Sequence, residues 1–429
     1  MQNPTSFLRL IFFGIVFMAT APDQANGQRK GINQDESKVP EYVLPDLMTS
    51  PDGTKTNSIA DWKTSRRKEV LELFTNHVYG NFPDKNVTIR FSTDSTKQWE
   101  VLGGKAIRKE IGIQFGQGEE QVTATLLLTI PKSDKPVPCF LGYNFDGNHT
   151  TTDDKRVSIT KSWVRNKNQV KQNQASEDDR GCQASRWPCA EIIKQGYALG
   201  TMYYGDVDPD YHDEFQNGIH PLFYAEGQTK PTKNQWGSIG AWAYGLSQAL
   251  NYLETDTSVN AKRVAVIGHS RLGKTSLWTG ATDQRFWITI SNNSGCGGAA
   301  LHRRKFGETV QVINRVFPHW FCDQFVEYNE KEAEIPVDQH MLMALIAPRP
   351  VYVASATADL WADPKGEFLS LAHSDPVYAL YGESAMGKMP NADQAVINGS
   401  RGYHLRKGKH NITGYDWSKY IEFANQHLK

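Results

Sequence analysis

The sequence has no excess of charge of either sign and little cysteine. Lys and Arg together number 47, as do Asp and Glu, so the 429-residue chain has a formal net charge of zero. Nucleic acids and anionic membranes bind proteins through basic surfaces, so this balance gives no support to either as a partner. Repeats and low-complexity tracts are also absent. With 39% hydrophobic residues, a chain of this length can bury a large core.

An apolar run occurs at the N-terminus, where Arg9 precedes residues 10–19. This run is too short and too close to the chain start for a membrane-spanning helix, and small residues follow as far as Gly27. The pattern is typical of a cleaved signal peptide, which we place at residues 1–27. No cysteine lies in this region to carry a lipid anchor. We therefore expect an exported protein, secreted or periplasmic, without a membrane partner.

The cysteines are few and odd in number, since only five occur in the chain. In an oxidising compartment at most two disulfides can form among them. The sequence leaves the pairing open; Cys182 and Cys189 are the nearest pair, and Cys296 with Cys322 is another to test. No cysteine–histidine cluster has the spacing of metal ligands, so we predict no metal site.

The most informative stretch joins an apolar segment to a helical pattern through a serine. Residues 264–267 predict a short buried strand, and a helix is expected from Arg271 onward. Gly268 and Gly273 remove side chains that would collide in a sharp turn, which leaves Ser270 exposed at its tip. The pattern indicates the nucleophile elbow of serine hydrolases, although the spacing is G-x-S-x-x-G rather than G-x-S-x-G. A helix N-cap serine is the alternative interpretation.

Strands and helices alternate along the rest of the chain. Helices are predicted at residues 61–78, 242–253 and 417–428, and strands at 107–115, 121–130, 137–142, 197–204, 287–291 and 350–356. Polar residues 28–45 predict a loose leader, and polar residues 155–180 an exposed loop. This alternation favours a mostly parallel sheet covered by helices on both faces. We predict one α/β-hydrolase domain over residues 46–429, a three-layer sandwich.

A serine hydroxyl becomes nucleophilic only when a histidine takes its proton and a carboxylate orients that histidine. In this fold class the chain order is serine, acid, histidine. Asp359 follows the predicted strand 350–356, and His410 lies on the loop before the last helix. His404 is a rival in a strand-like segment, and His269 is interpreted as structural. The alternative for Asp359 is a loop cap.

The motifs resemble those of one family, the bacterial glucuronoyl esterases of carbohydrate esterase family 15 (4-O-methyl-glucuronoyl methylesterases). The resemblance is carried by residues 268–275 (GHSRLGKT), 291–301, 361–368 and 408–410, and in the N-terminal half by Trp62, 66–69, 78–80, 144–149 and 204–210. It covers nearly all of the chain after the predicted signal peptide. The Ser-Arg-x-Gly-Lys elbow is specific to this family, which accounts for the longer spacing between the glycines.

The resemblance implies a catalytic role for each matching residue. Ser270 is expected to attack the ester carbonyl and His410 to act as its general base. Arg271 is expected to hold the oxyanion together with its own backbone amide, a task that suits a permanently charged guanidinium. No cofactor and no metal are implied.

The resemblance also implies a sugar-binding set. Lys274 is expected to bind hydroxyls of the glucuronate ring, and Glu308 and Trp361 match further sugar-contacting positions. A carboxylate that accepts from hydroxyls and a flat aromatic edge suit a pyranose. Gln311 and Arg315 are weaker candidates, because they lie one and two turns beyond Glu308 if that segment is helical.

The chain departs from the family pattern at Asn293. Many bacterial members have a glutamate there that serves as the triad acid, and an amide cannot stabilise the imidazolium with a charge. In the protease triad, such an acid-to-amide change lowers turnover by about ten thousandfold. We therefore predict that Asp359 is the acting acid. The alternative is a weak enzyme.

The sequence thus predicts hydrolysis of the ester between glucuronic or 4-O-methylglucuronic acid of glucuronoxylan and a lignin alcohol. The reaction would pass through an acyl-enzyme on the elbow serine, in a monomer. Two alternatives stay open. One is a generic carboxylesterase or acetyl xylan esterase, and the other is a catalytically weakened protein that binds uronate glycans.

Overall fold

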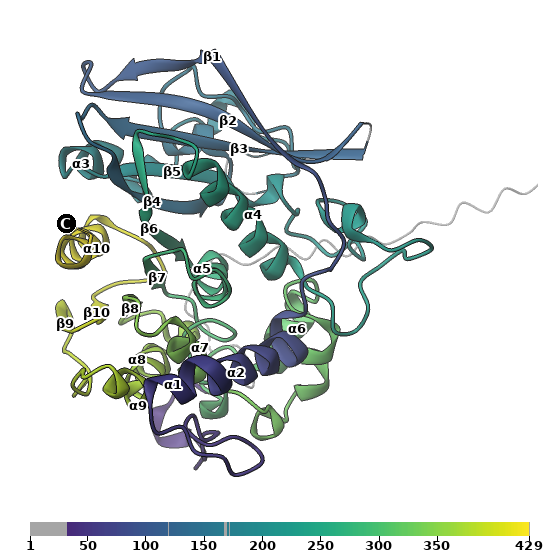
Figure 1. Cartoon of the computed structure of the whole chain (residues 1–429), viewed down its shortest axis with the longest axis vertical. Coiled ribbons are helices and arrows are strands. Elements are labelled where there is room, and N and C mark those ends of the chain that lie inside the picture. The colour runs from purple at the N-terminus through teal and green to yellow at the C-terminus, as the bar shows by residue number, and fades with distance from the viewer. Residues whose placement is uncertain (1–31, 119, 167–169, 171, 429) are drawn as a thin grey trace, which may run out of the picture. The chain divides into compact units, whose positions relative to one another are not determined.

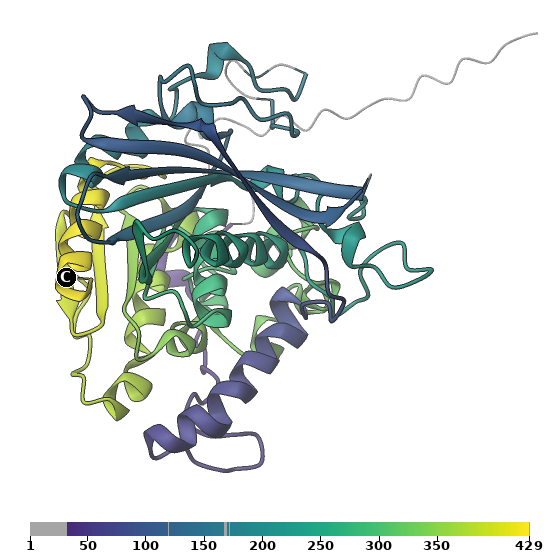
Figure 2. The same ribbon diagram turned by 45° about the horizontal axis from the view of Figure 1, so that its top comes forward.

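Ten strands of the described chain form one sheet, in the order β1-β2-β3-β5-β4-β6-β7-β8-β10-β9 (Figure 1). The architecture comes from a computed structural model that describes residues 32–118, 120–166, 170 and 172–428. The strands are β1 (Ile89–Val101), β2 (Ala106–Gln117), β3 (Glu120–Pro131), β4 (Val137–Asn144), β5 (Ala198–Tyr203), β6 (Val259–His269), β7 (Ile288–Asn292), β8 (Val351–Ala356), β9 (Gln394–Asn398) and β10 (Arg401–Arg406). The central strands β5, β4, β6, β7, β8 and β10 are parallel. Antiparallel strands complete both ends, and in Figure 2 the long strands β1 to β3 twist across one of them.

Helices cover both faces of the parallel strands (Figure 1). One face packs against α4 (Ser238–Leu253), α5 (Arg271–Thr282) and α8 (Pro364–Ala372), and the other against α3 (Cys189–Lys194) and α10 (Gly414–His427). Helix α7 (Gln339–Ile346) packs on α5 and α8. Alternate side chains of a strand point to opposite faces. In β6, accordingly, Val264 and Val266 belong to the larger apolar cluster, whereas Ala265 and Ile267 belong to the second. The predicted α/β-hydrolase class with three layers and a mostly parallel sheet is confirmed.

The remaining helices lie around the larger cluster. The predicted helix at 61–78 falls within a continuous helical stretch over residues 59–79, made of α1 (Ile59–Asp61), α2 (Arg67–Phe74) and π-helical turns. The other helices are α6 (Val310–Val316) and α9 (Asp375–Leu380). Among the described residues, no helix is both long and apolar enough to cross a membrane.

Some elements were not predicted from the sequence. Strand β1 lies at one edge of the sheet, and its middle residues 92–98 are all polar and exposed, so the alternation of apolar and polar side chains is confined to its two ends. Helices α6, α8 and α9 have only six to nine residues each, too short for a clear 3.6-residue period. The antiparallel pair predicted at 107–115 and 121–130 is confirmed as β2 and β3.

Two segments that composition predicted to be loose or exposed are held by the fold. Within the predicted loose leader (28–45), Glu36 forms ion pairs with Arg304 and Lys365, so the leader is anchored there. Within the predicted exposed loop at 155–180, Val157 and Val164 are buried. Composition does not reveal such contacts, because isolated anchoring residues are too few to change the average polarity of a segment. The predicted signal peptide lies outside the described residues.

None of the five cysteines forms a disulfide, so neither of the two suggested pairs is linked. Cys139, Cys296 and Cys322 are buried, whereas Cys182 is exposed and Cys189 is intermediate. Burial raises the pKa of Cys139 and of Cys322 to about 12, which keeps both as unreactive thiols. The position of each buried cysteine depends on the part of the core that it fills. The spacing of cysteines along the chain does not show which of them meet in space.

Candidate active site

Ser270 occupies a sharp turn between the end of β6 at His269 and the start of α5 at Arg271. Its φ of 59° lies in the left-handed region, which is strained for a residue with a side chain. A glycine at 268 is required, because a Cβ there would lie 1.8 Å from the carbonyl oxygen of Leu272. The geometry is that of the predicted nucleophile elbow.

His410 and Asp359 lie on the loops that follow β10 and β8, at the same edge of the sheet as the elbow. His410 Nδ1 is 2.6 Å from Oδ2 of Asp359, which is buried. The two loops are joined by a hydrogen bond from the Ala358 amide to the Gly408 carbonyl oxygen (2.8 Å). The ring of His269 lies 4.5 Å from that of His410, which places the imidazole beside the elbow. With Nδ1 bound to the carboxylate, Nε2 is the nitrogen that can take a proton from a hydroxyl.

Asn293 touches the acid and lies after β7 on the same edge. Its Nδ2 donates to Asp359 Oδ2 at 2.8 Å, and its amide N–H donates to the Ala354 carbonyl oxygen at 2.7 Å. Asp359 Oδ2 therefore contacts both the amide and the imidazole of His410, which fixes the carboxylate in one orientation. In the structure Asn293 is thus a hydrogen-bond donor to the carboxylate of Asp359.

The two other histidines near the site have structural partners. His404 Nε2 is 2.8 Å from Oδ1 of Asp416, and its Nδ1 is 3.1 Å from the hydroxyl of Tyr352. His269 Nδ1 is 2.6 Å from Oδ1 of Asn292. Burial lowers the pKa of both imidazoles, which keeps them neutral at physiological pH.

A second buried carboxyl group, Glu367 on α8, was given no role by the sequence. Its Oε1 accepts from the backbone amides of Ser294 (2.7 Å) and Gly295 (3.0 Å), and Ser355 Oγ is 2.6 Å from Oε2. Burial raises the pKa of Glu367 to about 8, and the charge of Asp359 adds to the effect. This shift favours the protonated form of Glu367, and it is the carboxylate of Asp359 that contacts the imidazole of His410.

Arg271 is fixed by a buried carboxylate that the sequence did not single out. Its guanidinium pairs with Asp210, which is fully buried, and lies 4.8 Å from the centre of the Trp320 ring. Asp210 also accepts from Trp320 Nε1 (2.8 Å) and lies 2.9 Å from His319 Nε2. Burial would raise the pKa of Asp210, but the positive charge of Arg271 and the hydrogen bond with His319 hold it well below its ordinary value. The charged carboxylate keeps the Arg271 guanidinium in place next to the elbow.

Lys274 lies on α5, one turn beyond the serine, and is buried. Its Nζ donates to the carbonyl oxygens of Ser294 and Cys296, both at 2.6 Å, and is 3.5 Å from Oε2 of Glu308. An ammonium group has three donors, so all of them already have partners in this structure. Lys274 therefore contacts Glu308, another residue of the predicted sugar-binding set, and its own role in binding sugar hydroxyls stays a prediction.

The other candidate sugar residues come from two loops. The Glu308 amide donates to the carbonyl oxygen of Trp361 at 2.9 Å, so these two predicted residues are brought together. Gln311 lies in the first turn of α6 and is half-buried, and Arg315, near the end of that helix, is exposed.

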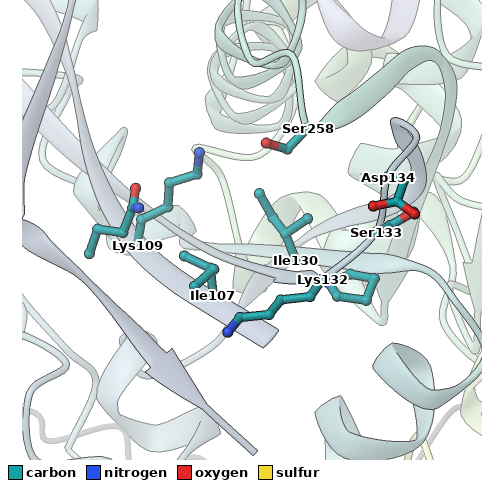
Figure 3. Close-up of a pocket in the computed structure, with 9 residues that line it drawn as sticks. Ile107, Lys109, Ile130, Lys132, Ser133, Asp134 and Ser258 are labelled. Carbon is teal, nitrogen blue, oxygen red and sulfur yellow. The ribbon is translucent and has the colours of Figure 1, made fainter. Parts of the chain in front are cut away.

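A cavity of about 470 Å³ lies at the other end of the strands (Figure 3). Ser258, which lines it, precedes β6, whose opposite end carries the elbow. Its two lysines are ion-paired, Lys109 with Asp256 and Lys132 with Glu100. In the described part of the chain, no group of three His, Cys, Asp or Glu residues is arranged to hold a metal ion.

An elbow serine, an imidazole bonded to a buried carboxylate, and a mostly parallel sheet that brings them to one edge define a class of protein. They are the features of a serine hydrolase with the α/β-hydrolase fold.

Comparisons with known proteins place the chain within that class. Residues 223–382 match the family described as fungal glucuronyl esterase. The chain is 50% identical to carbohydrate esterase MZ0003 of an unknown prokaryotic organism, over 96% of this chain and 95% of that protein. The structure of a promiscuous CE15 esterase from the marine bacterial metagenome matches with 51% identity and a TM-score of 0.87, over 93% of this chain and all of that one. A glucuronoyl esterase from Solibacter usitatus matches with 42% identity and a TM-score of 0.86, over 92% and 100%. The chain belongs to carbohydrate esterase family 15.

Proposed function

We propose that the protein is a serine esterase that hydrolyses esters of glucuronic or 4-O-methylglucuronic acid. The single observation that carries the proposal is the hydrogen bond of His410 to the buried Asp359 beside the strained elbow of Ser270. The family relatives named as glucuronoyl esterases support the choice of acyl group.

The proposed reaction has two halves. Ser270 Oγ attacks the ester carbonyl carbon while His410 Nε2 takes the hydroxyl proton, and Asp359 stabilises the resulting imidazolium. The oxyanion is held by the Arg271 guanidinium and the backbone N–H of the same residue. The C–O bond to the alcohol then breaks, and the imidazolium gives its proton to the departing oxygen. Water attacks the acyl-enzyme in the same way, which releases the uronic acid and restores the serine.

We assign the uronate ring to the side of the site formed by Glu308 and Trp361. A carboxylate can accept hydrogen bonds from ring hydroxyls, and the indole offers an apolar face. The ion pair of Lys274 with Glu308 holds the Glu308 carboxylate in place and balances its charge. Gln311 is placed at the margin of this surface as an additional donor or acceptor.

The proposed natural substrate is the ester that joins glucuronoxylan to lignin alcohols. Such a polymer cannot enter a cell, so this assignment agrees with a signal peptide at residues 1–27 and with export to the periplasm or the medium. We propose a monomeric enzyme that needs neither a membrane nor a nucleic acid as a partner.

A second candidate function is a broad carboxylesterase, and the promiscuity ascribed to one structural relative favours it. The test compares kcat/KM for benzyl glucuronate and benzyl cyclohexanecarboxylate, which have the same alcohol and differ in the ring hydroxyls. We expect the glucuronate to be preferred by roughly a hundredfold or more, because a site built for hydroxyls is left with unpaired polar groups by the analogue. Equal values would establish the broad carboxylesterase. Binding of glucuronate without turnover of either ester would establish a glycan-binding protein.

Asp210, which pairs with Arg271, provides a further prediction. Asp210→Asn should lower kcat by roughly 10²- to 10³-fold, the effect of losing one oxyanion donor. It should also lower the free energy of unfolding by about 3–5 kcal/mol, because a buried charge loses its partner. Steady-state kinetics and urea unfolding measure the two effects.

Asp208→Asn is the matched control. Asp208 lies two residues away and is 2.9 Å from Nδ1 of the buried His220, so its replacement also disrupts a buried hydrogen bond of an aspartate. We expect it to lose stability and keep kcat. An equal loss of kcat in both variants would assign Asp210 to stability alone.

A further inference from the structure

The N-terminal arm, defined here as residues 33–38, crosses two loops of the active site. Glu36 in this arm receives a two-pronged contact from Arg304: Oε2 is 2.7 Å from Nη2 and Oε1 is 3.3 Å from Nη1. The same carboxylate is 2.5 Å from Nζ of Lys365. The arm therefore reaches residues that follow it by 268 and 329 positions in the chain.

Arg304 joins the arm to the loop that carries Trp361. Its side chain is 2% exposed, and its Nε is 2.8 Å from Oδ2 of Asp363, two residues beyond the tryptophan. Asp363 in turn caps α8 by accepting from the Gly366 amide at 3.0 Å. The Arg304 guanidinium thus lies between the carboxylate of Glu36 in the arm and that of Asp363 in the loop that carries Trp361. Bidentate contacts of this kind fix geometry as well as charge.

A backbone contact joins the arm to the loop that carries Glu308. The Gly307 amide donates to the carbonyl oxygen of Asn33 at 2.7 Å, and the next amide, that of Glu308, donates to the Trp361 carbonyl oxygen at 2.9 Å. The approach is close, because a Cβ on Gly307 would lie 2.4 Å from that Trp361 oxygen. The arm therefore holds Gly307, and the loop that carries Trp361 holds the next residue, Glu308.

We propose that Glu36 is a positioning residue, and that the N-terminal arm sets the distance between Glu308 and Trp361 across the uronate site. The proposal rests on the function proposed above, in which these two residues contact the sugar. The carboxylate of Glu36 is 46% exposed, and such ion pairs contribute little to stability. Its contribution is geometric, since it fixes Arg304 and, with it, the two loops. Asp359 begins the same loop, two residues before Trp361, but its carboxylate is held by Asn293 and His410 rather than by the arm.

The test replaces Glu36 and compares substrates that do and do not need the sugar site. Glu36→Gln should raise KM for benzyl glucuronate by about three- to tenfold with kcat nearly unchanged, because loosened positioning weakens ring contacts. The values for benzyl cyclohexanecarboxylate should not change. Glu36→Asp should restore part of the KM. Glu41→Gln is the matched control, an exposed glutamate five residues further along the leader.

A second readout does not depend on turnover. Amide hydrogen exchange in the segment 302–309 should be faster in Glu36→Gln than in the wild type, and unchanged in Glu41→Gln, because the arm holds the Gly307 amide. If the wild type hydrolyses no glucuronate ester, the proposed function fails, and exchange alone decides whether the arm orders the loop.

Three results would overturn the proposal. An unchanged KM with unchanged exchange would mean that the arm does not position the loops. Faster exchange with an unchanged KM would mean that it orders them without affecting the substrate. A lower melting temperature with equal losses on both substrates would assign Glu36 a purely structural role.

Discussion

Replacement of Ser270 by alanine is expected to lower kcat for benzyl glucuronate by about 10⁴- to 10⁶-fold, the range found when a triad serine is removed. The reason is that the neighbouring imidazole then has no hydroxyl to deprotonate. The fold should persist, because alanine takes the place of serine at the same backbone turn without added volume. Release of glucuronic acid and the melting temperature together measure the effect.

Covalent labelling distinguishes the nucleophile from a residue that only supports the site. An aryl sulfonyl fluoride should add one equivalent to the wild type at Ser270, detected by mass spectrometry, and none to Ser270→Ala. Labelling of the variant at another serine, or retention of its turnover, would refute the assignment of the elbow as nucleophile.

The identity of the acid gives the second large effect. Asp359→Asn should lower kcat by about 10⁴-fold, because an amide beside His410 cannot stabilise the imidazolium with a charge. Asn293→Ala should cost far less, roughly tenfold, because it removes one hydrogen bond that orients the carboxylate. Kinetics of the two variants on one substrate make the comparison direct.

The opposite pattern would show that the acid is misassigned. If Asp359→Asn kept most of its turnover while Asn293→Ala lost it, the amide position would carry the essential contact with the histidine. The hydrogen bond between Asp359 Oδ2 and His410 Nδ1 argues against that pattern.

The elbow could be predicted from the sequence because it is a local structure. Residues 264–271 contain the strand, the obligatory Gly268 and the serine, and their geometry depends on neighbours within a few positions. Asp359 and His410 could also be predicted from the sequence, because the chain order in this fold class places the acid and the histidine on loops after late strands. The structure brings these two together, as the sequence analysis expected, and their catalytic roles stay predictions.

Composition and motif matching failed where a residue acts through a distant partner. Asp210 lies 61 positions before Arg271, and Glu36 lies 268 before Arg304, so no local pattern could link either pair. The motif at Lys274 likewise did not reveal that its ammonium group contacts Ser294, Cys296 and Glu308, which follow it by 20 to 34 positions.

The sequence by itself determined the layered sheet and the elbow, because both follow from apolar periodicity or from short-range backbone constraints, and the order of Ser270, Asp359 and His410 followed from the fold class. Only the tertiary structure decided that Asp359 contacts both Asn293 and His410, that the buried Asp210 pairs with Arg271, and that Glu36 of the leader pairs with Arg304. Those properties depend on burial and on charge pairs between distant segments, and the energy of a buried charge is set by its surroundings rather than by its neighbours in the chain.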